Sequence, residues 1–176
     1  MFGLWQLPIL IMTTLYQAIA CYKENKLAPP GQMIDVGGHR LHLMHVPPIY
    51  PDDEAKPTIV IDHSLGGVEG YLLVRELSRV AEVCVCDRAG YGWSDISKSP
   101  ATSEQSVTNL DIALTKANVK PPYILVGNSL GSYHMRLYAH RFPKKVAGMV
   151  LTDGLHEKAM LNMPPRLRLL QLLFLS

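Results

Sequence analysis

The chain has 176 residues, of which 48% are hydrophobic and 18% are charged. This composition excludes collagen, coiled coils and disordered chains, and the length allows one ordinary domain. Lys and Arg number 17 against 15 for Asp and Glu, which gives a formal net charge of +2. Because no basic cluster with interleaved aromatic residues accompanies this balance, we expect no nucleic-acid partner.

The chain has three cysteines, too few for a disulfide framework. Cys84 and Cys86 lie two apart in an apolar run, which as a strand would place both on one face as small hydrophobic side chains. A zinc site needs more ligands at closer spacing. We therefore expect no metal, and no cofactor.

The N-terminal segment 2–20 carries no charged residue. At about 1.5 Å per residue, a helix of this length nearly crosses a hydrocarbon core of about 30 Å. We interpret residues 1–22 as a retained signal-anchor helix of a single-pass membrane protein, followed by a proline-containing linker at 23–32. Two alternatives remain open: a secreted protein whose signal peptide is cleaved after Ala20, and a protein lipidated at Cys21 after cleavage.

Beyond the linker, apolar strand-like runs alternate with helical stretches, which predicts a mainly parallel sheet with helices on both faces. The predicted strands are 33–36, 40–46, 58–62, 82–87, 123–127 and 146–152, and the predicted helices are 69–80, 102–117 and 130–142. Gly37 and Gly38 indicate a hairpin turn, so the first two strands are expected to be antiparallel. Thr102 or Ser103 is expected to cap the second helix.

A G-x-S-x-G motif, Gly127-Asn128-Ser129-Leu130-Gly131, lies between a predicted strand and a predicted helix. A serine at such a tight turn is forced into strained backbone angles, and glycines two residues to either side let the chain bend. The turn lifts the Ser129 hydroxyl clear of the sheet, and the Leu130 N–H can donate to a developing oxyanion at the helix N-terminus. This pattern predicts a catalytic nucleophile at Ser129. The alternative is a serine that only caps the helix.

Five segments, in order, make residues 31–154 resemble the α/β-hydrolase fold family, in particular its membrane-anchored or secreted members. They are 35–43 (DVGGHRLHL), 65–67 (LGG), 86–95 (CDRAGYGWSD), 122–131 (PYILVGNSLG) and 146–153 (VAGMVLTD). The resemblance implies a nucleophile at Ser129 and oxyanion-hole N–H groups at Leu130 and Leu65. It also implies that Asp87 and Arg88 cap and shape the cleft rather than react.

Two features depart from the family pattern. Asn128 stands where the family usually has His, and after His156 no strand or histidine follows that could complete the order Ser, acid, His. Asp153, at the end of the last predicted strand, is the candidate acid. His156 is poorly placed as a base, and His63 is expected to order the oxyanion loop. His39, His42 and His45 lie on the N-terminal hairpin and are expected away from the site. His134 and His140 lie on the helix after Ser129 and are expected at the surface or as satisfied partners.

These departures lead us to expect a partial α/β-hydrolase domain at 33–154 and the start of a truncated cap region at 155–176. The C-terminal strands and the cap would be missing, and the chain would be the N-terminal portion of a longer hydrolase, as a fragment or an incomplete gene model. The strand 146–152 would then form an apolar, unprotected sheet edge.

The predicted function is hydrolysis of an ester, thioester or amide bond through an acyl-serine intermediate, with activity in doubt for a truncated chain. A small-molecule or lipid-like acyl substrate and membrane contact through the N-terminal helix are expected. The competing hypothesis is a catalytically dead, membrane-anchored domain with an interaction role. The sequence indicates neither the particular substrate nor the oligomeric state.

Overall fold

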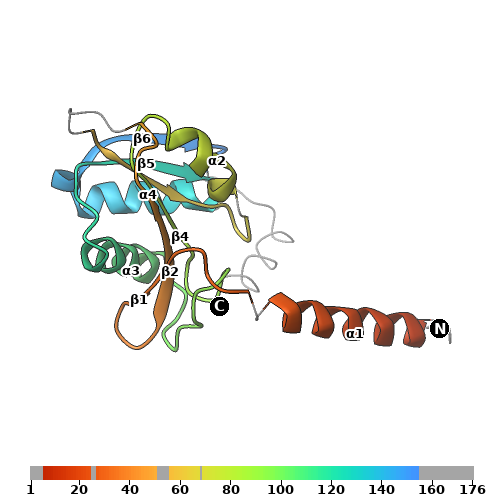
Figure 1. Ribbon diagram of the computed structural model, residues 1–176. Helices are drawn as coiled ribbons and strands as arrows, with labels where there is room; N and C mark the ends of the chain where they lie inside the picture. Colours follow the sequence, from red (N-terminus) through yellow and green to blue (C-terminus); the bar gives the residue numbers. More distant parts are fainter. Residues whose placement is uncertain (1–5, 25–26, 51–55, 68, 155–176) are drawn as a thin grey trace. The chain divides into compact units, whose positions relative to one another are not determined.

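The computed structural model describes residues 6–24, 27–50, 56–67 and 69–154 (Figure 1). Its contacts divide the chain into two compact units, Met1–Pro30 and Gly31–Ser176. Every residue of the candidate site that the structure describes lies in the second unit.

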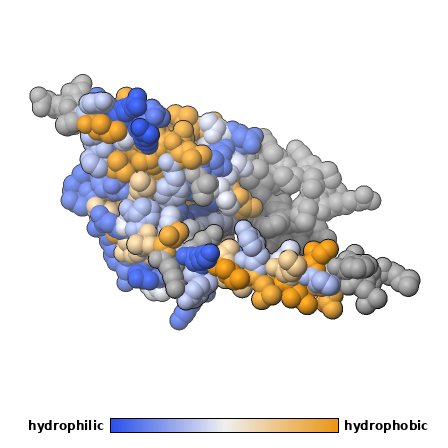
Figure 2. All heavy atoms as spheres, turned by 45° about the vertical axis from the view of Figure 1, so that its right-hand side comes forward, coloured by the Kyte–Doolittle hydropathy of each residue, from blue (hydrophilic) through white to orange (hydrophobic). Residues whose placement is uncertain are grey.

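The first unit contains helix α1 (Gln6–Glu24), whose apolar side chains are exposed (Figure 2). The prediction of a membrane-spanning anchor at 1–22 is not supported, because no helix among the described residues is long and apolar enough to cross a membrane. The described helix has 19 residues, and these include the polar Thr13, Thr14 and Gln17 as well as the charged Lys23 and Glu24, which lower its mean hydropathy.

Within the described residues, the second unit is built on a six-stranded sheet in the order β1-β2-β4-β3-β5-β6. The strands are β1 (Gln32–Asp35), β2 (Arg40–Val46), β3 (Thr58–Asp62), β4 (Val83–Cys86), β5 (Tyr123–Asn128) and β6 (Val146–Thr152). β1 and β2 form an antiparallel hairpin and β2 pairs antiparallel with β4, whereas β4, β3, β5 and β6 run parallel. The predicted mainly parallel sheet is confirmed. The predicted hairpin is also found, with Gly37 and Gly38 at φ values of 106° and 96° in its turn.

Three helices and one 3-10 turn accompany the described strands: α2 (Glu69–Leu77), α3 (Ser103–Lys116), α4 (Leu130–Arg141) and η1 (Pro143–Lys145). Thr102 caps α3, since its hydroxyl accepts from the Gln105 N–H at 3.2 Å. α2 ends three residues before the predicted Val80. The N–H groups of Arg79 and Val80 bond to carbonyls three residues back instead of four, which tightens and ends the helix.

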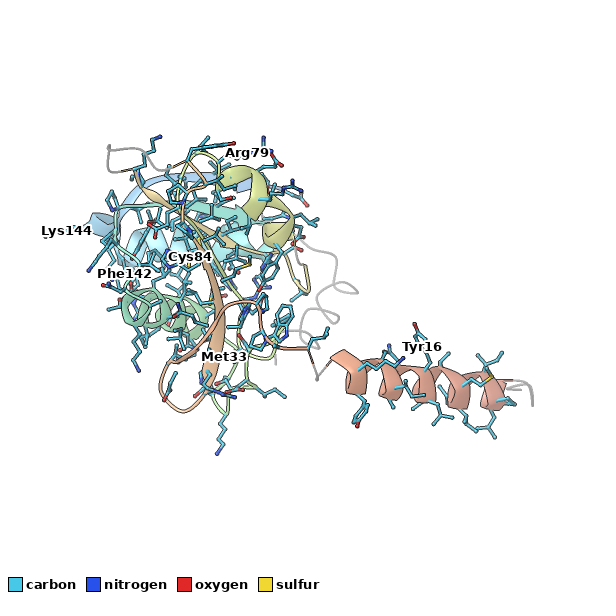
Figure 3. All side chains as sticks on the ribbon, viewed as in Figure 1. Tyr16, Met33, Arg79, Cys84, Phe142 and Lys144 are labelled. Carbon is cyan, nitrogen blue, oxygen red and sulfur yellow. The ribbon has the colours of Figure 1, made fainter. Side chains whose placement is uncertain are left out.

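Side chains alternate across the sheet and so supply two cores. Val60 and Cys84 face the core that α3 and α4 cover, whereas Ile59 and Val83 face the core that α2 covers. Figure 3 shows Cys84 inside this unit and Tyr16 projecting from α1. Because both faces of β3 and β4 are covered, these strands read as continuous apolar runs in the sequence.

β6 lies at the edge of the described sheet. Its residues Met149, Val150 and Leu151 are 45%, 51% and 38% exposed. The expectation of an apolar edge at 146–152 therefore agrees with the exposure found here.

Candidate active site

Ser129 joins the end of β5 to the start of α4 and has φ 50° and ψ −110°. This left-handed φ is strained for a residue with a Cβ, and such strain concentrates at functional sites. The Ser129 N–H donates to the Thr152 carbonyl at 3.0 Å, so the neighbouring strand β6 holds the turn. The Ser129 side chain makes no capping hydrogen bond to α4. The reading of Ser129 as a plain helix cap is therefore wrong.

The glycines on either side of Ser129 are required by close backbone contacts. A Cβ on Gly127 would lie 2.6 Å from the Gly131 carbonyl oxygen, and a Cβ on Gly131 would lie 2.3 Å from the Asp62 carbonyl oxygen. Both distances are far inside normal contact. The G-x-S-x-G spacing thus allows the elbow to pack directly against the end of β3.

Leu65 and Leu130, the two residues expected to supply oxyanion N–H groups, line one cavity of about 60 Å³. Leu65 comes from the turn after β3, and Leu130 is the first residue of α4. Arg88, Tyr91 and His134 also line this cavity. The structure thus brings the two sequence-predicted positions together beside the elbow.

Arg88 holds the oxyanion turn through its guanidinium group. The group donates to Asp62 Oδ1 at 2.6 Å, to the His63 carbonyl at 2.8 Å and to the Ser64 carbonyl at 2.6 Å. The other carboxylate oxygen of Asp62 lies 2.7 Å from His134 Nδ1, on the elbow helix. This buried network therefore ties the turn at 63–65 to α4, and Arg88 has the shaping role that the resemblance implied.

Glu69, at the start of α2, is a site residue that sequence reasoning missed. Its Oε1 accepts from the Ser64 hydroxyl and, at 3.2 Å, from the Asn128 side-chain amide. The hydrogen bond from Ser64 holds the pKa of Glu69 below its usual value. Asn128 in turn accepts from the Thr152 hydroxyl at 3.3 Å. Asn128, at the position where the family usually has His, thus bridges the oxyanion turn and β6.

Asp87 is the centre of a second buried cluster, beside the first. It accepts from the Tyr71 hydroxyl at 2.7 Å and from the Trp93 N–H at 3.1 Å, and it lies 3.0 Å from His42 Nδ1. His42 is fully buried, and its Nε2 accepts from the Gly31 N–H at 3.0 Å. His42 is therefore a satisfied structural partner of Asp87, which directly precedes Arg88 in the chain. The expectation that the hairpin holds His42 away from the site is not confirmed.

Asp153, the candidate acid, directly follows Thr152, whose carbonyl accepts from the Ser129 N–H. Because of this hydrogen bond, the peptide between Thr152 and Asp153 lies next to Ser129. Asp153 itself is exposed and has a positive φ of 47°. His156 lies outside the described residues. Among the residues that the structure describes, no histidine nitrogen hydrogen-bonds to the Ser129 hydroxyl.

Acid is expected to destabilise the protein in two steps. Burial lowers the pKa of His63, so below a pH of about 6.5 the unfolded chain takes up a proton that the folded chain resists. Burial raises the pKa of Asp62 and Asp87, but hydrogen bonds from His134 and His42 outweigh it and hold both pKa values low. Their stabilisation is present above a pH of about 3.9 and is lost as the pH falls through the folded values.

Urea unfolding midpoints measured between about pH 3 and pH 8 test this expectation. In the variant His63→Asn the decline below about pH 6.5 should disappear, while the decline at lower pH should remain. A midpoint that rises on acidification would contradict the assignment.

The comparison with known proteins assigns the chain to a family. The family model described as alpha/beta hydrolase fold matches residues 57–173, and the chain belongs to this family. The uncharacterized protein YbdG of Bacillus subtilis is 26% identical over 152 residues, which are 84% of this chain and 45% of YbdG. An uncharacterized vacuolar membrane protein of Saccharomyces cerevisiae is 30% identical over 119 residues, or 63% of this chain and 18% of that protein.

Solved structures show the same fold. The meta-cleavage product hydrolase CumD has a TM-score of 0.59 and 25% identity, with 70% of this chain and 45% of that one covered. A probable hydrolytic enzyme of Pseudomonas aeruginosa has a TM-score of 0.66 and 19% identity, with 79% and 46% covered. The chain spans less than half the length of each of these relatives.

Proposed function

We propose that the chain carries the nucleophile and oxyanion hole of a serine hydrolase that acts on ester, thioester or amide bonds. The observation that carries this proposal is the strained φ of Ser129 at the strand-to-helix turn, with its hydroxyl not used as a cap. A serine with a purely structural role would adopt relaxed backbone angles or cap the helix with its hydroxyl. A nucleophile must instead hold its hydroxyl clear of the backbone. Membership in the alpha/beta hydrolase fold family supports the same reading.

In the proposed reaction, Ser129 Oγ attacks the carbonyl carbon of the substrate and forms an acyl-serine, while the leaving group departs with a proton. The N–H groups of Leu130 and Leu65 stabilise the oxyanion, because both residues line the cavity beside the elbow. Asp153 is the proposed acid, supported by its place directly after Thr152. Water then releases the acyl group, and no cofactor enters this chemistry.

A second candidate function is a catalytically inactive domain with an interaction role. It is favoured by one observation: within the described residues no histidine nitrogen is bonded to the Ser129 hydroxyl. Without a general base, a serine hydrolase retains only the residual rate that binding and the oxyanion hole supply.

Labelling with a fluorophosphonate probe separates the two candidates. Ser129 Oγ would bond to phosphorus and fluoride would leave, so peptide mass spectrometry should find the adduct on the peptide that contains Ser129. Labelling of that peptide supports the hydrolase. Intact, folded chain without an adduct supports the inactive domain.

We also propose that α1 contacts a membrane surface without crossing the bilayer. Two observations support this: the exposed apolar side chains of α1, including Leu10 and Leu15, and the vacuolar membrane relative. Burying apolar side chains at a lipid interface is favourable in proportion to their area. A lipid-like acyl substrate would be consistent with this location.

Flotation with phosphatidylcholine vesicles tests this contact. The double variant Leu10→Gln and Leu15→Gln should reduce the vesicle-bound fraction by at least about tenfold. The matched control is Leu72→Gln, because Leu72 is 76% exposed on α2, and it should bind like the parent. Equal binding by all three chains would refute the membrane role of α1.

A further inference from the structure

Glu69, in the first turn of α2, connects two parts of the candidate site that are far apart in the chain. Its Oε1 accepts from the Ser64 hydroxyl and, at 3.2 Å, from the Asn128 side-chain amide. Ser64 directly precedes Leu65, and Asn128 directly precedes Ser129. One carboxylate oxygen thus joins the oxyanion turn, which carries one of the expected N–H groups, to the elbow that carries the candidate nucleophile.

Gly67 leaves the space that this contact occupies. A Cβ on Gly67 would lie 2.1 Å from Glu69 Oε2 and 2.2 Å from the Ser64 hydroxyl oxygen. Real Cβ atoms essentially never lie within 3.0 Å of another heavy atom. Any larger residue at this position would therefore displace the Glu69 carboxylate, the Ser64 hydroxyl or both.

The oxyanion turn has a second support in Arg88, which holds a different point of the elbow helix. Arg88 donates to the Ser64 carbonyl at 2.6 Å. Through the carboxylate that it shares with His134, Arg88 connects the turn to the second turn of α4. Glu69 instead connects the turn to the residue immediately before Ser129. Its contact therefore bears directly on the spacing between the turn and the nucleophile.

That spacing matters because the stabilisation of an oxyanion depends steeply on distance. Donors are effective at about 2.7–3.1 Å from the oxygen, and a misplacement of about 1 Å can cost about a hundredfold in rate. Leu65 is 46% exposed, so packing around its side chain restrains the turn only in part. Hydrogen bonds at the neighbouring Ser64 must supply the rest of the restraint.

We propose that Glu69 is a positioning residue, whose carboxylate sets the distance between the oxyanion turn and Ser129. The N–H groups of Leu65 and Leu130 can then act on one substrate oxygen, while Glu69 itself touches no reacting atom. The effect on catalysis rests on the proposed function. The ordering of the turn stands on the hydrogen bonds of Glu69 alone.

Glu69→Leu in the full 176-residue chain tests this role. The limiting rate of fluorophosphonate labelling, at saturating probe, should fall at least about tenfold, while the probe concentration that gives half this rate should not change. Glu69→Gln keeps an oxygen that can accept from Ser64 and should recover most of the loss. The matched control is Glu76→Leu on the same helix, because Glu76 is 61% exposed and pairs only with Arg79 among the described residues; it should label like the parent.

A double substitution separates positioning from a general loosening of the fold. Asn128→Asp can still accept from the Thr152 hydroxyl, but it turns a second carboxylate toward Glu69 at the 3.2 Å contact and should slow labelling. Adding Glu69→Gln supplies an amide donor to the new carboxylate and should restore about tenfold in rate. A double variant that labels no faster than Asn128→Asp would overturn the proposed contact.

The nitrogen-15 order parameter of the Leu65 amide reports on the turn without any reaction. It should be about 0.85 in the parent and in Glu69→Gln, and below about 0.6 in Glu69→Leu. An unchanged value in Glu69→Leu would overturn the positioning role. If the parent takes up no probe while the order parameter still falls in Glu69→Leu, the proposed hydrolase fails and the ordering of the turn by Glu69 is supported.

Discussion

Ser129→Ala is expected to abolish covalent modification by a fluorophosphonate and to reduce any esterase rate at least about a thousandfold. The reason is that Ser129 alone occupies the strained elbow position with its hydroxyl uncommitted to the helix. Alanine keeps the Cβ and the backbone contacts, so the fold should be unaffected. The measurement is the labelling rate, read from the mass of the intact chain, together with hydrolysis of a p-nitrophenyl ester.

The matched control for this variant is Ser99→Ala. Ser99 is an exposed serine in the loop before α3, so its loss should leave both readouts at the parent level. Undiminished labelling of Ser129→Ala would place the reactive group elsewhere and remove the main support for the proposed mechanism.

Arg88→Met is expected to lower the free energy of unfolding by about 3–5 kcal/mol, because it leaves a buried carboxylate without its cationic partner. The side chains of Arg88 and Asp62 are 12% and 7% exposed. The same substitution also frees the His63 and Ser64 carbonyls. We therefore expect the oxyanion turn to loosen and the labelling rate of Ser129 to fall, with urea unfolding as the stability measurement.

Two comparisons make this prediction specific. Arg40→Met breaks an ion pair with Asp95 whose side chains are 57% and 35% exposed, so it should cost about 0–1 kcal/mol. Adding Asp62→Asn to Arg88→Met should recover part of the lost stability, because the buried charge is then gone. Equal losses for Arg88→Met and Arg40→Met would show that the buried network contributes nothing special.

Much of the fold could be predicted from the sequence because local patterns are strong in this chain. The strands 40–46, 58–62 and 146–152 have the predicted bounds. Thr58–Asp62 is a β-branched run that begins after Pro57, and the other two strands end before Pro47 and before Asp153-Gly154. The hairpin at Gly37 and Gly38 and the Thr102 cap follow from residue chemistry alone. The end of α2 did not follow, because three-residue hydrogen bonding after Leu77 leaves no clear sequence signal.

The candidate site divides in the same way. The G-x-S-x-G spacing by itself indicated Ser129 and Leu130, because only a tight strand-to-helix turn needs glycines at both ends. Glu69 escaped notice, since a glutamate at a helix start is ordinary. Its bonds to Ser64 and Asn128 exist only because β3, β5 and α2 bring distant residues together.

The sequence by itself thus determined the class of fold, the order of its elements and the position of the candidate nucleophile, because these depend on periodicity and on backbone-bending residues. Only the tertiary structure decided how Asp62, Arg88 and His134 are paired, and that within the described residues the buried Nε2 of His63 has no hydrogen-bond partner. The hydrogen-bonded partners are distant in the chain: Arg88 and His63 are 25 positions apart, and His134 and Asp62 are 72 positions apart. No local pattern encodes such pairings, because they depend on which side chains the folded sheet places within reach of one another.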